Sequence, residues 1–230
     1  MALIDDLLVD PMLVNQIIVQ ANASSLRSQD FDKKHNIFVY SKRISLSSTS
    51  ALDSVFWDEH NITVCQSNNE VISFNFSGCL MAKTPLTGGN LIFHINCLDY
   101  KHPDDRRYDF AKYLLDKKIP CSDLTLFQPI CDKWIYEQEF LASDNMRFVW
   151  GVISRNNECY SLIVDLDTNL EKYKLHSIWL HEKNQGNILI YNSLTEFCRF
   201  TKENTPNSVF TNLQSVLDKG RKVLIKSFVD

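Results

Sequence analysis

The sequence predicts an α/β fold of the α+β type, in which a two-layer, mixed and largely antiparallel β-sandwich core is surrounded by helices. The prediction rests on strand-like runs that recur along most of the chain and on a few helix-like segments between them. The chain has 230 residues, 44% of them hydrophobic, so it can bury a sizeable core. No repeat or long linker divides it, and we expect a single domain over residues 1–230.

The first segment is predicted to be helical. Apolar residues recur at helical spacing from Leu3 to Ala23, and Pro11 interrupts the pattern. The polar stretch Asn22–Asp30 that follows is typical of a loop or linker. We therefore interpret residues 1–30 as an N-terminal helix and linker at the periphery of the domain.

Strands dominate the rest of the chain, with two further helices. Apolar runs bounded by turn residues predict strands at 36–46, 54–65, 70–77, 90–98, 146–154, 159–166, 174–180, 187–193 and 221–229. A helix is predicted at 102–118, where acidic residues come first, basic residues come last and Pro103 lies near the start. A second helix is predicted at 208–220, ending at Gly220.

Composition excludes several classes of function. The formal net charge of −4 argues against a nucleic-acid binder, because such proteins need a concentrated basic surface. No segment approaches the roughly 20 apolar residues of a membrane span. Acidic residues lie near the N-terminus, where a secretory signal needs a basic region, so we expect no cleavable export signal. We therefore expect neither a nucleic-acid partner nor a membrane partner.

The cysteines predict neither a disulfide framework nor a metal site. Their number is odd and no C-x-x-C pair occurs, so we interpret the thiols as reduced. His176 and His181 flank a predicted strand without a carboxylate or Cys at ligand spacing, and we expect no metal and no other cofactor. Most of six cysteines are predicted to be small buried hydrophobic residues: Cys65, Cys97, Cys121, Cys131, Cys159 and Cys198.

The four tryptophans lie in strand-like runs and are predicted to belong to the core. Any exposed one would suit contact with a protein substrate, because Trp is enriched at binding hot spots. They are Trp57, Trp134, Trp150 and Trp179.

The stretch Phe76–Asn96 combines a hairpin pattern with two reactive side chains. Cys79 follows Ser77 and Gly78, and His94 lies on the second apolar run, on the same face as Asn96. In the first run, alternation predicts one face formed by Ile72, Phe74 and Phe76 and another formed by Val71, Ser73, Asn75 and Ser77. If the two runs pair as neighbouring strands, the thiol and the imidazole come within hydrogen-bond reach.

A thiol beside an imidazole suits nucleophilic attack on an acyl carbon. A free thiol has a pKa of about 8.5, so a nucleophilic Cys79 needs a base such as His94. A third group normally orients the imidazole, and Ser73 is the candidate. Ser73 and Cys79 would be roughly 20 Å apart on a straight strand, so the chain must bend at Ser77–Gly78, and Gly78 permits this. Backbone N–H groups near Gly78 and Cys79 would bind the oxyanion.

These motifs resemble a known catalytic segment. Ser77-Gly78-Cys79, the Gly88-Gly89 pair and the "FHIN" at 93–96 resemble the cytotoxic necrotizing factor and Burkholderia lethal factor family of glutamine deamidase toxins. That family has a Leu-Ser-Gly-Cys motif, in which Phe76 here replaces Leu, and a His on a following strand. In the lethal factor branch a Thr hydroxyl stands six residues before the Cys, where this chain has Ser73; the necrotizing factor branch uses a backbone carbonyl. The match covers roughly 25 residues.

The resemblance implies a function. A bacterial toxin or effector, secreted or delivered to act in a host cytosol, would deamidate a glutamine of a host protein, a small GTPase or a translation initiation helicase. It implies no cofactor, and we expect a monomer. The family's sandwich of mixed sheets wrapped by helices is compatible with the predicted fold.

Two alternatives stay open. A cysteine peptidase or related amidase would use the same Cys-before-His order. A non-enzymatic interaction protein would bury Cys79 in its core. The remaining histidines have no comparable neighbourhood in the sequence: His35, His60, His102, His176 and His181.

Overall fold

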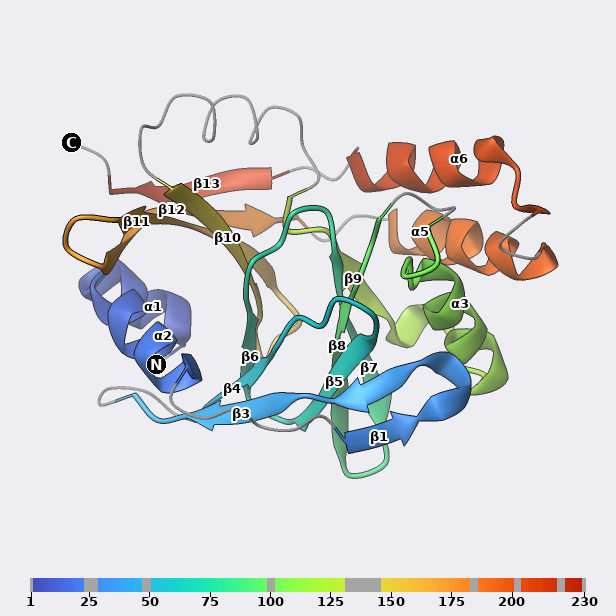
Figure 1. The fold of residues 1–230 in the computed structure, drawn as a ribbon, viewed down its shortest axis with the longest axis horizontal. Coiled ribbons are helices and arrows are strands. Elements are labelled where there is room, and N and C mark those ends of the chain that lie inside the picture. Colours follow the sequence, from blue (N-terminus) through green and yellow to red (C-terminus); the bar gives the residue numbers. More distant parts are fainter. Residues whose placement is uncertain are drawn as a thin grey trace.

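The computed structural model describes residues 2–22, 29–46, 51–98, 102–130, 146–182, 186–200, 204–218 and 222–228. Two mixed β-sheets lie face to face, and helices cover the outer face of each, so four layers succeed one another (Figure 1). The predicted fold class, an α+β sandwich with mixed sheets and surrounding helices, is confirmed.

The first sheet, sheet A, contains the hairpin that carries Cys79 and His94. Its strand order is β1 (Gln29–Asp32), β2 (Ile37–Val39), β5 (Ile62–Ser67), β8 (Gly89–Ile95), β7 (Leu80–Leu86) and β9 (Thr125–Phe127). Neighbouring strands are antiparallel except β2 and β5, which run parallel.

The second sheet, sheet B, carries Ser73 at the end of one of its inner strands. Its order is β13 (Lys222–Ser227), β12 (Lys172–His181), β11 (Cys159–Asp167), β10 (Met146–Ile153), β6 (Glu70–Ser73), β4 (Leu52–Val55) and β3 (Ser41–Ile44). Only β4 and β6 pair in parallel within it.

Helices cover both outer faces. The helices α1 (Leu3–Val9) and α2 (Leu13–Asn22) pack on sheet B, in an apolar cluster that includes Ile72 and Trp150. The helices α3 (Arg107–Asp116), α5 (Gly186–Glu196) and α6 (Asn207–Asp218) pack on sheet A around Phe93. The described residues also include three short 3-10 helices: η1 (Lys33–His35), η2 (Cys121–Asp123) and η4 (Phe197–Arg199).

A third apolar cluster fills the space between the sheets. It includes Val71 and Ile163 of sheet B and Met81 and Ile92 of sheet A. Cys79 belongs to this cluster. The candidate nucleophile therefore lies in the inner layer of the sandwich.

The helix predictions are largely correct. Pro11 separates α1 from α2, because proline cannot continue the hydrogen-bonded ladder of a helix. The backbone N–H of Leu3 donates to the buried carboxylate of Glu70 at 2.7 Å, which fastens α1 to sheet B. The helix predicted at 102–118 begins only at Arg107. None of the helices in the described ranges has the length and apolar character needed to cross a membrane.

One strand prediction is wrong. Residues 187–193 belong to the helix α5, which packs against α3 and α6. Its Leu194 is fully buried, and the Tyr191 hydroxyl donates to the Ile119 carbonyl at 2.9 Å. A short apolar run cannot be assigned to strand or helix by periodicity alone, and tertiary contacts decide between them.

Other predicted strands are divided or shortened. The run 36–46 splits into β2 and β3, which belong to different sheets, and 54–65 contains the end of β4, a loop and most of β5. The run 70–77 is a strand only as far as Ser73. Strand β1 lies partly where a loop was expected, and β9 had no predicted counterpart.

The predictions for tryptophan and cysteine are correct in part. Trp150 and Trp179 are buried, whereas Trp57 is 44% exposed. Cys65 and Cys159 are buried. Three cysteines are only half-buried: Cys97, Cys121 and Cys198. Trp134 and Cys131 lie outside the described residues.

Candidate active site

The β7–β8 hairpin places Cys79 and His94 on the same face of sheet A. Met81 pairs with His94 and Leu80 with Ile95, so Cys79, directly before β7, comes opposite Asn96. Directly opposed side chains share a face, and this face is the one turned toward sheet B. Cys79 and His94 are thus diagonal neighbours, a relationship that spaces residues about 7–8 Å apart.

Ser73 contacts His94 across the space between the sheets. The Ser73 hydroxyl oxygen lies 2.8 Å from His94 Nδ1 and 2.7 Å from the Val55 carbonyl oxygen. The hydroxyl has one proton, which it donates to Val55, and it therefore accepts from the Nδ1–H of His94. This assigns the tautomer in which Nε2 carries a lone pair. His94 Nε2 is buried and has no hydrogen-bond partner among the described residues.

A crossover between the sheets carries the chain from Ser73, which bonds His94 Nδ1, to Cys79, whose thiol bonds Asn96 and not His94 Nε2. Strand β6 ends at Ser73 in sheet B, and β7 begins at Leu80 in sheet A. Between them Asn75 has a φ of 59° and Gly78 has a φ of 138°. Residues other than glycine rarely adopt the value of Gly78. The bend that the Ser73 assignment requires is therefore present, and it begins two residues before the predicted Ser77.

Phe76 lies on the opposite face from the one predicted. Alternation placed it with Ile72 and Phe74, but it belongs to the cluster between the sheets. The cause is the left-handed backbone of Asn75, which breaks the period of two. The Phe76 ring stacks on the His94 imidazole, with ring centroids 4.2 Å apart and planes 7° from parallel. Phe76 thus fixes the plane of the imidazole, while Ser73 fixes its tautomer.

Cys79 and His94 are both buried and neutral. Cys79 is 3% exposed and His94 is 1% exposed. Burial raises the pKa of the Cys79 thiol to about 11, although the backbone N–H of Cys97 opposes this shift. Burial also lowers the pKa of His94 to about 3. In this conformation the pair consists of a thiol and a neutral imidazole at neutral pH.

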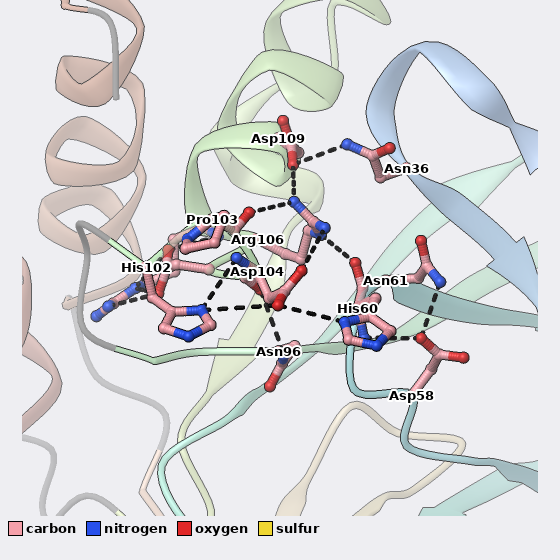
Figure 2. A network of polar contacts seen from close by, with 12 residues as sticks. Asn36, Asp58, His60, Asn61, Asn96, His102, Pro103, Asp104, Arg106 and Asp109 are labelled. Atoms are coloured by element: carbon pink, nitrogen blue, oxygen red, sulfur yellow. Dashed lines mark hydrogen bonds and ion pairs between the residues drawn. The ribbon is translucent and has the colours of Figure 1, made fainter. Parts of the chain in front are cut away.

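The thiol is directed at Asn96. Cys79 Sγ lies 3.6 Å from the Asn96 side-chain oxygen, so the thiol donates to an amide in this conformation. The Asn96 amide nitrogen in turn donates to the backbone carbonyls of Glu59 and Asp104. These two residues lie in the surface loops 56–61 and 102–106, which share a polar network (Figure 2).

The turn before Cys79 is held by a glutamine that the sequence did not single out. Ser77 is exposed and Gly78 is half-buried. The Gln128 side-chain amide donates to the Gly78 carbonyl at 2.5 Å. Because the peptide unit is planar, this bond also sets the direction of the Cys79 N–H, the candidate oxyanion donor.

A second serine–histidine pair lies elsewhere between the sheets. The Ser161 hydroxyl donates to the Pro129 carbonyl at 2.8 Å and lies 2.6 Å from His181 Nε2. Burial lowers the pKa of His181 to about 3, as it does for His94. His181 differs in that its Nε2 is the nitrogen bonded to the serine, whereas His94 keeps its Nε2 unpartnered within the described structure.

The other histidines contact carboxylates. His35 lies 3.0 Å from Asp32 and 2.9 Å from Asp116, and His176 lies 3.3 Å from Asp165. Within the described residues no group of three or more His, Cys, Asp or Glu side chains is arranged to hold a metal ion.

Ser73, Cys79 and His94 were predicted from the sequence, whereas the residues that hold them in place were not, and the catalytic role of the three stays a prediction. The sequence did point to Asn96, because Asn96 follows His94 by two positions on a strand and therefore lies on the same face. Gln128 and the Val55 carbonyl carried none, because their roles depend on contacts between distant segments.

Comparisons with protein families, with curated proteins and with solved structures found no match to this chain. The resemblance of residues 73–96 to a toxin family therefore remains a prediction.

Proposed function

We propose that this protein is a cysteine-dependent amidohydrolase that deamidates a glutamine side chain of another protein. Cys79 is the nucleophile, His94 is the general base and acid, and Ser73 is the residue that orients His94. Gly78 and Ser77 form the turn that presents the Cys79 N–H to the oxyanion. The proposal names no cofactor.

One observation carries the proposal more than any other. The Ser73 hydroxyl accepts from His94 Nδ1 at 2.8 Å, which leaves the Nε2 lone pair unpartnered in the described structure and on the face that also holds Cys79. A buried nitrogen without a partner is costly and needs an explanation. A base that waits for the proton of a nearby nucleophile provides one.

The reaction follows from these positions. His94 Nε2 takes the proton of the Cys79 thiol, and the sulfur attacks the side-chain carbonyl carbon of the glutamine, forming a C–S bond. Backbone N–H groups stabilise the oxyanion. His94 then protonates the nitrogen, and the C–N bond breaks to release ammonia. Water, deprotonated by His94, attacks the thioester, the C–S bond breaks, and the sulfur recovers its proton.

Activation requires a rearrangement of the resting site. A thiol with a pKa of about 11 does not yield its proton to an imidazole with a pKa of about 3. The thiol must turn from Asn96 to His94, where each charge formed stabilises the other. Substrate binding is the event that would drive this change.

The substrate and the place of action rest on the resemblance. We propose a bacterial toxin or effector, secreted or delivered to a host cytosol, that acts as a monomer on a host protein such as a small GTPase or a translation initiation helicase. Conversion of one glutamine to glutamate replaces a neutral side chain with a negative one, which can disable a switch or catalytic glutamine.

One observation favours a different candidate, a non-enzymatic interaction protein. Cys79 is only 3% exposed and belongs to an apolar cluster, as expected of a structural cysteine. A peptidase would share the same dyad.

Mass spectrometry of host-cell proteins separates the three candidates. The proteins are incubated with the wild-type protein or with Cys79→Ser. Glutamine-to-glutamate conversion of an intact chain, present only with the wild type, supports deamidation. New fragments would indicate a peptidase, and identical spectra would favour the interaction protein.

A further inference from the structure

Asn96 connects the candidate nucleophile to the protein surface. Its side chain is 2% exposed, and its amide oxygen accepts from the Cys79 thiol at 3.6 Å and from the Trp57 indole N–H at 3.5 Å. Its amide nitrogen donates to the carbonyls of Glu59, at 2.5 Å, and Asp104, at 3.3 Å. A carboxamide has two donor hydrogens and two lone pairs, so its whole capacity is used.

The two loops that Asn96 contacts are also joined to each other (Figure 2). His60 Nδ1 lies 3.2 Å from the Asp104 carboxylate, and an Arg106 nitrogen lies 3.3 Å from the same carboxylate. Arg106 Nε donates to the His60 carbonyl. Hydrogen bonds and ion pairs therefore join loops 56–61 and 102–106 into one surface segment, here called the rim. Asn96 connects this rim to the Cys79 thiol by hydrogen bonds.

Trp57 is the exposed aromatic residue of this rim. It is 44% exposed, whereas Trp150 and Trp179 are buried in the sandwich. Its polar N–H donates to Asn96, and the rest of the indole is an apolar ring surface. An exposed indole of this kind offers a large contact area at low entropic cost, which is why Trp is enriched among the residues that anchor protein partners.

We propose that Trp57 is the substrate-docking residue of this site and that Asn96 is the positioning residue that couples Trp57 to the Cys79 thiol. The inference rests on the proposed function. In the unliganded protein Asn96 holds the thiol proton away from His94. A substrate segment that packs on the indole displaces loop 56–61, Asn96 releases the thiol, and the thiol turns to His94 Nε2. The segment carries the target glutamine beside an apolar side chain that fits the indole.

The first test measures alkylation of Cys79 by iodoacetamide, read by peptide mass spectrometry without any substrate. Trp57→Phe keeps a ring but lacks the N–H, and Trp57→Ala lacks both. Both variants should speed alkylation by about tenfold, the effect of losing roughly one hydrogen bond from the closed state. The buried Cys65 and Cys159 report on general loosening and should keep their wild-type rates. Unchanged Cys79 rates, or equal increases at all three cysteines, would overturn the coupling.

The second test measures deamidation kinetics on a protein that the wild type modifies. Trp57→Ala should raise KM by about 30-fold, the loss expected for a hot-spot anchor, with kcat nearly unchanged. Trp57→Phe should keep a KM near the wild-type value, because the ring remains. Phe31→Ala, which removes another exposed aromatic residue, is the matched control and should change neither constant.

The outcomes separate the inference from the proposed function. A fall in kcat without a change in KM for Trp57→Ala would overturn the docking role. A wild-type protein without deamidase activity would refute the proposed function and the docking role together. In that case the alkylation rates still decide whether Trp57 controls the thiol.

Discussion

At the scale of single residues, the proposed catalysis depends on how His94 is held. Ser73 fixes its tautomer, Phe76 fixes its plane, and Nε2 has no hydrogen-bond partner among the described residues. The pair Ser161–His181 has a similar hydrogen bond and similar burial. Substitution of Ser161 or His181 is therefore a control for the same substitution of Ser73 or His94, because it changes a similar pair that does not adjoin Cys79.

Loss of the Ser73 hydroxyl should reduce turnover. In Ser73→Ala the imidazole loses its orienting acceptor, and we expect kcat to fall by about 10- to 100-fold. Ser73→Thr should retain activity, because it supplies the same hydroxyl on a strand. Ser161→Ala should leave kcat unchanged. Steady-state deamidation rates of the three variants test this, and an unchanged rate in Ser73→Ala would assign the orienting role to another acceptor.

Removal of the catalytic side chains should have unequal effects on stability. His94→Ala removes a buried ring that stacks on Phe76, and it should lower the free energy of unfolding by roughly 2–4 kcal/mol. Cys79→Ser is nearly isosteric, and its hydroxyl can still donate to Asn96, so the change should stay within about 1 kcal/mol. Urea denaturation measures both. A loss of several kcal/mol in Cys79→Ser would favour a purely structural cysteine.

At the scale of elements, the sequence predicts the β7–β8 hairpin better than the connection before it. Alternation and a Gly-Gly turn are local signals, and they place His94 on its strand. The crossover from β6 to β7 between sheets is not local, and its consequence for Phe76 could not be read from a period of two. The helix α5 was missed for the same reason, since α3 and α6 determine its packing.

The backbone at Gly78 should be required for activity, because its φ of 138° strains any other residue. Gly78→Ala should lose about 1–3 kcal/mol of stability and most of its activity, since the turn positions the thiol. Gly88→Ala is the matched control: its φ is 93°, no atom lies within 4 Å of an added Cβ, and it should lose stability but keep activity. Activity per folded molecule in both variants is the measurement. Equal losses of activity would contradict a specific role for Gly78.

At the scale of the whole molecule, the fold class follows from the pattern of strands, but the division of strands between two sheets does not. Runs such as 36–46 cross from one sheet to the other, and only the packed sandwich shows that Ser73 and His94 face each other. Cys79 and His94 could be singled out from the sequence because their residue types are chemically distinctive, and their catalytic role stays a prediction. The contacts of Gln128 could not be predicted, because they join segments that are distant in the sequence. The sequence placed Asn96 on the face of His94 and offered Trp57 as a substrate contact if exposed, but it assigned neither of them to the thiol.

Two of the buried histidines, His94 and His181, should make the protein sensitive to acid. The pKa of His94 and of His181 falls from 6.5 to about 3 in the folded state. The unfolded chain therefore binds more protons between about pH 6.5 and pH 3, and stability should fall as the pH drops through this window. The slope of the free energy of unfolding against pH should correspond to an uptake of about two protons on unfolding. In His181→Gln it should correspond to one proton fewer. Urea unfolding from pH 7.5 to pH 4.5 tests this, and a slope unaffected by His181→Gln would contradict it.

The central claim is that Cys79 and His94 convert a glutamine to glutamate on a target protein. The most direct measurement is the rate of that conversion at the modified site, per folded molecule, for the wild type, Cys79→Ser, His94→Ala and the control His181→Ala. We predict no conversion above background for Cys79→Ser and His94→Ala, and a wild-type rate for His181→Ala. Conversion that persists in Cys79→Ser, or that is lost equally in His181→Ala, would contradict the claim.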